Sequence, residues 1–185
     1  LFMTVGAHIA VLLPHNLAVK LSETIGENGH ESLSRLSGER YGWRQLGQQV
    51  DAVLKEMKQA PENNGRDVFV ICSQYGVASN LAFYTPGQIQ THLWSKRRVH
   101  GENYRFWDDF PSLKGMNAIF VVKQERHIEN ALSSLQKHFA RLDAPLHVPI
   151  TINGQQIRSF LIMRCYEFNG ITPVFDNNPA QRKQI

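Results

Sequence analysis

The chain of 185 residues contains only two cysteines, Cys72 and Cys165, and they do not form a CxxC pair. A zinc site or a thiol-redox site is therefore not expected. Both cysteines lie in apolar runs, where a free thiol behaves as a small hydrophobic side chain, and we expect both to be buried and inert. A disulfide between them is the alternative, because the sequence does not give the distance between their Cα atoms.

The sequence also lacks the short motifs of several enzyme classes. It has no HExxH, no GxSxG and no Walker pattern, and residues 73–79 carry one glycine where a dinucleotide-binding loop uses three. The eight histidines are scattered, and we interpret them as surface or capping residues. We therefore predict no metal and no cofactor in this chain.

Charge of one sign is not abundant either. The net charge of +4 is small, and the basic residues cluster only at Lys96, Arg97 and Arg98. A nucleic-acid partner is not expected, because such proteins carry a basic stripe or patch. The triplet itself fits two interpretations, a solvated loop or a contact with phosphate groups or an anionic membrane surface.

The chain begins with an apolar, uncharged run, LFMTVGAHIAVLL from Leu1 to Leu13, which Pro14 ends. A membrane-spanning helix needs about 20 apolar residues, so the run is too short to be a complete one. We interpret residues 1–14 as the end of a truncated transmembrane helix; the alternative is a buried element of a globular core. Residues 15–41, rich in Gly, Ser and charge, then form a connector.

Residues 42–170 show the pattern of one α/β domain, and 42% of the whole chain is hydrophobic, enough for a core. Apolar residues spaced by three and four from Trp43 to Met57 predict an amphipathic helix. Ser73 is expected to cap a second helix, and Asn153-Gly154 is a strong hairpin turn signal. The further expected elements are strands at 68–72, 88–94 and 118–122, a helix at 128–139, and hairpin strands at 148–152 and 156–168, followed by a tail at 171–185.

This order of elements predicts a three-layer α/β fold. We expect a Rossmann-like or flavodoxin-like sheet that is mostly parallel, with the C-terminal hairpin as an antiparallel edge. In such a sheet ligands bind at the carboxyl ends of the strands, here near residues 73–79 and 123–127.

The segment 95–115 is a long polar loop, and aromatic residues gather in and near it. They fit two interpretations, a surface for sugar rings or lipid headgroups, or a roof that packs on the sheet. Asp108 and Asp109 likewise fit either a site for a cation or a sugar hydroxyl, or a helix cap or solvated turn. The aromatic residues are Phe83, Tyr84, Trp94, Tyr104, Phe106, Trp107 and Phe110.

Three stretches resemble a known family: GWRQLG at 42–47, VFVICSQYGVASNLAFYTPGQ at 68–88 and ENYRFWDD at 102–109. Their order is similar to that in the extracytoplasmic C-terminal domain of bacterial family 39 glycosyltransferases. These are membrane proteins of the GT-C type, similar to protein mannosyltransferases and to the aminoarabinose transferase of lipid A. The resemblance covers about residues 1–125.

The resemblance implies a parent enzyme that transfers a sugar from a polyprenyl-phosphate carrier to an acceptor on the outer face of the cytoplasmic membrane. The catalytic acid of the family lies in an early extracytoplasmic loop, so no residue of this chain takes that role. This domain would be accessory: it would pack on the membrane core of the parent, help to hold the carrier or an acceptor glycan, or stabilise the parent. The expected binding or docking residues are Tyr75, Ser79, Tyr84, Arg97, Arg98, Tyr104, Trp107 and Asp108.

Two other classes of function remain as alternatives. A free-standing α/β enzyme predicts a pocket at the strand ends with ionisable groups of perturbed pKa. A protein-interaction module predicts an exposed apolar patch without such groups.

Overall fold

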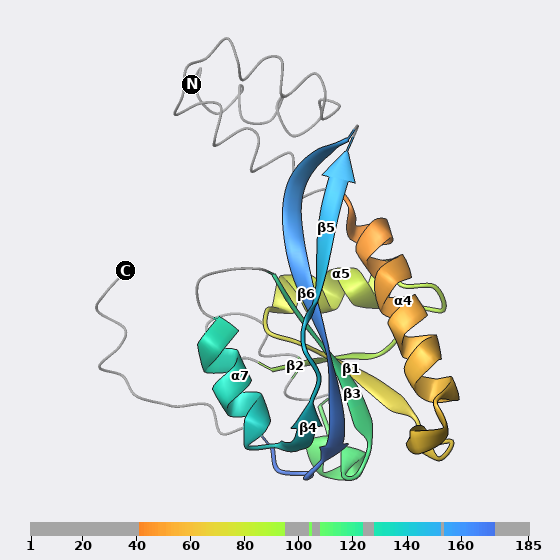
Figure 1. The fold of residues 1–185 in the computed structure, drawn as a ribbon, viewed down its shortest axis with the longest axis vertical. Helices are drawn as coiled ribbons and strands as arrows, with labels where there is room; N and C mark the ends of the chain where they lie inside the picture. Colours follow the sequence, from red (N-terminus) through yellow and green to blue (C-terminus); the bar gives the residue numbers. More distant parts are fainter. Residues whose placement is uncertain (1–40, 95–103, 105–107, 124–127, 153, 173–185) are drawn as a thin grey trace, which may run out of the picture.

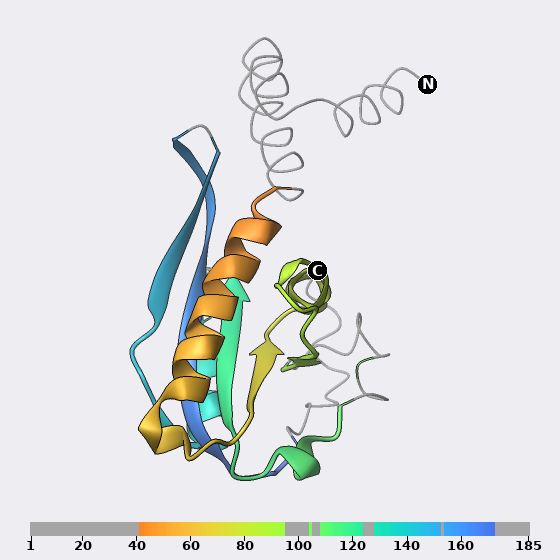
Figure 2. The ribbon, with the colours of Figure 1, turned by 90° about the vertical axis from the view of Figure 1, so that its right-hand side faces the viewer.

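The computed structural model describes residues 41–94, 104, 108–123, 128–152 and 154–172, and it contains a mixed six-stranded sheet with helices on both faces (Figures 1 and 2). The helices are α4 (Trp43–Gln59), α5 (Tyr75–Tyr84) and α7 (Ile128–Gln136), with the 3-10 helices η1 (Pro61–Asn63) and η2 (Phe110–Leu113). The strands are β1 (Val68–Cys72), β2 (Thr91–Leu93), β3 (Asn117–Lys123), β4 (Phe139–Leu142), β5 (Leu146–Ile152) and β6 (Gln155–Phe168).

The sheet has the strand order β2-β1-β3-β6-β4, with β5 also paired to β6. β1 is parallel to both β2 and β3, whereas β6 is antiparallel to β3, β4 and β5. The prediction of a mostly parallel, Rossmann-like or flavodoxin-like sheet is therefore wrong, because antiparallel pairs outnumber parallel ones.

The C-terminal third of the chain accounts for the error. The helix predicted at 128–139 ends at Gln136, and Phe139–Leu142 forms β4 instead. The predicted hairpin is present, with Gly154 at its tip in the left-handed region at φ +81°, but only one of its strands, β5, lies at an edge. β6 lies inside the sheet and bonds to β3 on one side and to β4 and β5 on the other. Antiparallel strands need no crossover helix, so residues 139–168 return directly across the sheet.

Alternate residues of the central strands supply two separate hydrophobic cores. On β1, Val68, Val70 and Cys72 face α4 and α5, while Phe69 and Ile71 face α7 and η2. The run is buried on both faces, as its continuous apolar sequence predicts. The helix predicted from Trp43 is confirmed, with one buried apolar stripe that includes Leu46 and Val50.

The two cysteines are buried and free, as expected. Cys72 belongs to the core under α4 and α5, and Cys165 belongs to the core under α7. The sheet separates the two thiols, so the alternative of a disulfide does not hold.

The start of α5 differs from the prediction. Gln74, not Ser73, is the N-cap residue, and its side chain makes no capping hydrogen bond. The Ser73 hydroxyl is buried without a hydrogen-bond partner in the described part of the chain. The prediction that Ser73 caps this helix is wrong.

The predicted transmembrane end at 1–14, nearly all of the connector at 15–41 and most of the tail at 171–185 lie outside the described residues. Among the residues that are described, no helix is both long enough and apolar enough to cross a membrane.

A glycine allows the close packing of α4 on the end of α5. A Cβ atom at Gly47 would lie 2.8 Å from the carbonyl oxygen of Tyr84 and 3.0 Å from the backbone nitrogen of Thr85. Backbone atoms cannot rotate away as a side chain can, so the helices would have to separate.

We predict that Gly47→Ala destabilises the domain by about 1–3 kcal/mol, the usual cost of overpacking. Gly76→Ala is the matched control, because it lies in α5 with no atom within 4 Å of the added Cβ. This control should be neutral or stabilising by up to about 1 kcal/mol, the helix preference of alanine over glycine. Urea unfolding followed by circular dichroism measures both, and equal stabilities of the two variants would contradict the packing argument.

Candidate functional site

The carboxyl ends of the parallel strands β1, β2 and β3 meet at one edge of the sheet, where the sequence predicted a ligand site. The chain passes from β1 through α5 to β2 on one side of β1, and β3 lies on the other side, so a topological switch point falls between β1 and β3. There the backbone N–H of Ser73 donates to the carbonyl of Val121 at 3.3 Å.

This edge carries no activated nucleophile among the described residues. The pKa is clearly displaced at four described groups, Asp67, Cys72, Cys165 and Tyr166, of which only Cys72 lies here. Burial raises the pKa of the Cys72 thiol well above its usual value, so it stays protonated and unreactive.

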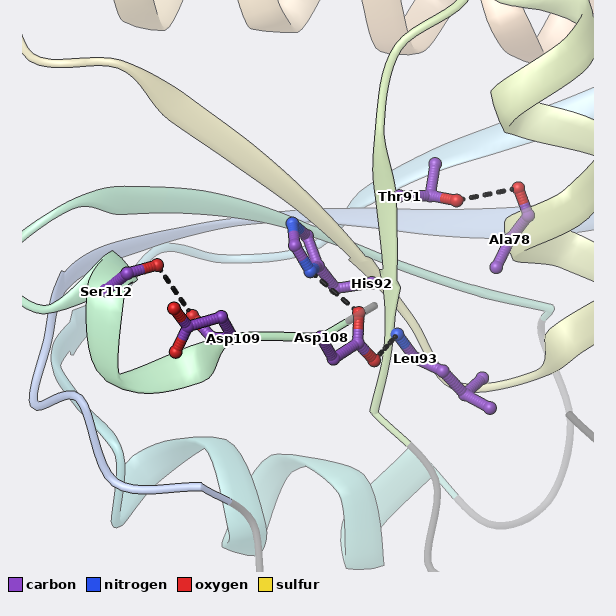
Figure 3. A network of polar contacts seen from close by, with 7 residues as sticks. All are labelled: Ala78, Thr91, His92, Leu93, Asp108, Asp109 and Ser112. Atoms are coloured by element: carbon purple, nitrogen blue, oxygen red, sulfur yellow. Dashed lines mark hydrogen bonds and ion pairs between the residues drawn. The ribbon is translucent and has the colours of Figure 1, made fainter. Parts of the chain in front are cut away.

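A buried polar pair lies beside β2 (Figure 3). His92 Nδ1 lies 2.8 Å from Asp108 Oδ1, and the Leu93 N–H donates to Asp108 Oδ2 at 3.2 Å. The two side chains are only 5% and 6% exposed. Because an ionised carboxylate only accepts hydrogen bonds, Nδ1 of His92 carries the proton. Each oxygen of the Asp108 carboxylate therefore has a hydrogen-bond partner within the protein.

The interpretation of the histidines as surface or capping residues is wrong for His92. Its ring is buried and packs against the rings of Phe69 and Phe110, with centroid distances of 5.8 and 5.9 Å. Its partner Asp108 is 16 residues away along the chain, and no local sequence pattern predicts a pair with that separation. The pair holds Asp108 and Leu93 together, which fixes both ends of the segment between them.

Asp108 and Asp109 do not act together. Asp109 is exposed and precedes η2, where its backbone carbonyl accepts from the Ser112 hydroxyl at 2.8 Å, and Figure 3 shows the two carboxylates pointing apart. The described residues contain no group of three or more His, Cys, Asp or Glu side chains able to hold a metal ion.

The other expected binding residues gather on α5. Tyr75, Ser79 and Phe83 follow one another at intervals of four along its outer face, and all three are exposed. The Ser79 and Tyr104 hydroxyls lie 3.2 Å apart and share a hydrogen bond. Tyr84 is 36% exposed at the end of the helix. Arg97, Arg98 and Trp107 lie outside the described residues.

Phe83 was not among the expected binding residues, although it is the most exposed large hydrophobic side chain that the structure describes, at 66%. Its spacing of four from Ser79 was the available signal. The sequence of α5, YGVASNLAFY, is apolar almost all round, so periodicity alone did not separate its outer face from its inner face.

A small polar hollow of about 40 Å³ lies at the opposite end of the sheet, near η1. Its buried amides are used within the fold: Asn117 donates to Asn63 at 2.8 Å and accepts from the Glu167 N–H at 3.0 Å. The volume has room for one or two water molecules, and the hollow is structural.

Comparison of the chain with protein-family models, with curated proteins and with solved structures gives no match.

Substitution of the two adjacent aspartates, one at a time, tests whether the buried His92–Asp108 pair stabilises the fold. Asp108→Ala leaves the His92 Nδ1–H and the Leu93 N–H buried without an acceptor, and we predict a loss of about 2–4 kcal/mol of stability. Asp109→Ala, on an exposed side chain, should change stability by less than about 0.5 kcal/mol. Thermal or urea unfolding of both variants measures the difference. An Asp108→Ala protein as stable as the Asp109→Ala protein would show that the pair does not hold the fold.

Proposed function

We propose that this chain is an accessory extracytoplasmic domain of a membrane glycosyltransferase similar to family 39, which transfers a sugar from a polyprenyl-phosphate carrier. The domain supplies no catalytic residue. It docks at the membrane side of the parent and helps to hold the carrier or the acceptor glycan.

The observation that carries this proposal is the convergence of the three family-like stretches on α5. Gly47, from the first stretch, packs on the backbone of Tyr84 and Thr85 in the second. Tyr104, from the third, shares a hydrogen bond with Ser79 of the second. Asp108 of the third stretch is anchored on His92, just beyond the second. Motifs that serve one common role are expected to meet in space.

The chemistry of the described surface favours this proposal over a free-standing enzyme. An enzyme site at the strand ends calls for ionisable groups with perturbed pKa, and among the residues described there the one group with a displaced pKa is the buried, protonated Cys72. The exposed aromatic side chains of α5 suit contact with a sugar ring, a lipid or another protein surface.

In the proposed arrangement, the domain lies on the extracytoplasmic side of the membrane. Arg97 and Arg98 then pair with the phosphate of the carrier, because guanidinium groups form short, charge-assisted hydrogen bonds to phosphate oxygens. Tyr75, Tyr84, Tyr104 and Trp107 provide faces on which a sugar ring stacks.

An antibody raised against the domain tests the proposal in fractionated native cells. We expect a band well above 21 kDa, in the detergent-soluble membrane fraction and accessible to protease from outside. A band near 21 kDa in the aqueous fraction would refute the proposal and favour the free-standing enzyme.

A second test concerns the arginines. With vesicles of phosphatidylcholine that include a few per cent of polyprenyl phosphate, we expect Arg97→Ala/Arg98→Ala to bind at least about tenfold more weakly than the unchanged chain, the size of a lost charge-assisted hydrogen bond. Vesicles without polyprenyl phosphate should show no such difference.

The matched control removes two other exposed cations, Lys55 and Lys58, whose ion pairs with Asp51 and Asp67 lie at the surface and contribute little. Lys55→Ala/Lys58→Ala should retain the preference for polyprenyl phosphate. Equal losses in the two double variants would mean that net charge alone, not an arginine site, attracts the carrier.

A further inference from the structure

The sequence contains four Asn-Gly pairs, and an asparagine side chain is chemically least stable when glycine follows it. The backbone nitrogen of the next residue can attack the side-chain amide, and glycine leaves that nitrogen unshielded because it has no Cβ atom. The structure describes both residues of two pairs, Asn64-Gly65 and Asn169-Gly170. The other two pairs, at 28–29 and 153–154, include asparagines that lie outside the described residues.

The two described pairs differ in how the fold holds the asparagine amide. Asn169 Nδ2 donates to the Lys137 carbonyl at 3.1 Å, and Asn169 Oδ1 accepts from the Ile171 N–H at 2.9 Å. Attack on this amide has to break both hydrogen bonds. The Asn64 side chain is exposed, and it forms no hydrogen bond to the described residues. The fold therefore protects the amide of Asn169 and leaves the amide of Asn64 open to reaction.

The turn around Asn64 controls the rate at which this amide can react. Asn64 has φ 50° and ψ 35°, so its Cβ atom and the Gly65 nitrogen lie on opposite sides of the Cα–C bond. Attack requires rotation about this bond, and the turn must open first. Arg66 helps to close the turn: its N–H donates to the Asn63 carbonyl at 3.0 Å, and its Nη1 donates to the Gly115 carbonyl at 2.9 Å. An exposed turn of this kind opens locally at a lower free energy than global unfolding.

We propose that Asn64-Gly65 is a site of spontaneous deamidation, which yields aspartate and isoaspartate at position 64. The Gly65 nitrogen attacks Cγ of Asn64 and loses its proton, and the new N–Cγ bond closes a succinimide ring. The Cγ–Nδ2 bond breaks and ammonia leaves. Water then adds to either ring carbonyl and opens the ring to one amide and one carboxylate. Water is the only co-reactant, and the reaction is independent of the function proposed above.

The isoaspartate product would disturb this end of the sheet. Its main chain runs through Cβ, which adds one backbone atom before Gly65 and moves the Arg66 N–H away from the Asn63 carbonyl. Asn63 is 1% exposed, and its Oδ1 accepts from Asn117 Nδ2 at 2.8 Å, so a shift of the turn reaches a buried amide pair. We therefore expect the deamidated chain to unfold at a lower urea concentration than the fresh chain.

Peptide mapping by mass spectrometry tests the site in the full 185-residue chain. The folded chain is incubated at mildly alkaline pH, and each asparagine-containing peptide is followed over time. We expect conversion at Asn64 to be at least about tenfold faster than at Asn169, because the latter must first lose two hydrogen bonds. An isoaspartyl methyltransferase with labelled S-adenosylmethionine should label the Asn64 peptide of the aged chain. Equal rates at the two asparagines, or no methylation of the Asn64 peptide, would overturn the proposal.

Two variants test the role of the turn and the effect of the product. Arg66→Ala removes the contact with the Gly115 carbonyl, so it should speed conversion at Asn64 several-fold and leave Asn169 unchanged. Equal acceleration at both sites would mean general loosening and would refute control by the turn. Asn64→Gly removes the amide and tolerates the left-handed conformation. After ageing, this control should keep its urea midpoint while that of the unchanged chain falls. A parallel fall in both would place the damage at another residue.

Discussion

The fold depends on the insertion of β6 between β3 and the β4–β5 edge. β6 pairs with β3 from Phe160 to Cys165, and its other edge is covered first by β5 and then by β4. Its side chains enter both cores: Phe160 and Ile162 meet the α4 and α5 side, while Met163 and Cys165 meet the α7 side. Loss of this strand would open both cores, which no change in a helix alone would do.

The sheet has two halves, which share β3. In the antiparallel half β6 pairs with β3, β4 and β5, and the small polar hollow lies between this half and the end of α4 with η1. The parallel half, β2-β1-β3, requires a crossover, and α5 is that crossover. Val77 and Leu81 anchor the helix in the core, so the core sets its position.

Local signals in the sequence were sufficient for the elements that local interactions form. The apolar stripe of α4, the buried runs of β1 and β3 and the Asn-Gly hairpin were all predicted correctly. The sheet was predicted wrongly because the sequence does not show which strands pair. Phe139 has the spacing of a helix residue, but it lies in β4 and pairs with Phe168 of β6. The hydrophobic pattern of a strand shows which of its faces is buried, but not which strands it pairs with. The His92–Asp108 pair was missed for the same reason, because its members belong to different elements.

The position of Tyr104 shows how the buried pair and the exposed helix are connected. The Asp108 N–H donates to the Tyr104 carbonyl at 2.8 Å, and Asp108 is itself held by His92 and Leu93. The hydroxyl contact between Tyr104 and Ser79 is exposed, and a hydrogen bond in water contributes about 1 kcal/mol at most. The buried pair and the packing of Tyr104 against the core under α4 and α5 together place Tyr104 beside the helix. In this way the buried Asp108 carboxylate helps to position a residue of the surface next to α5.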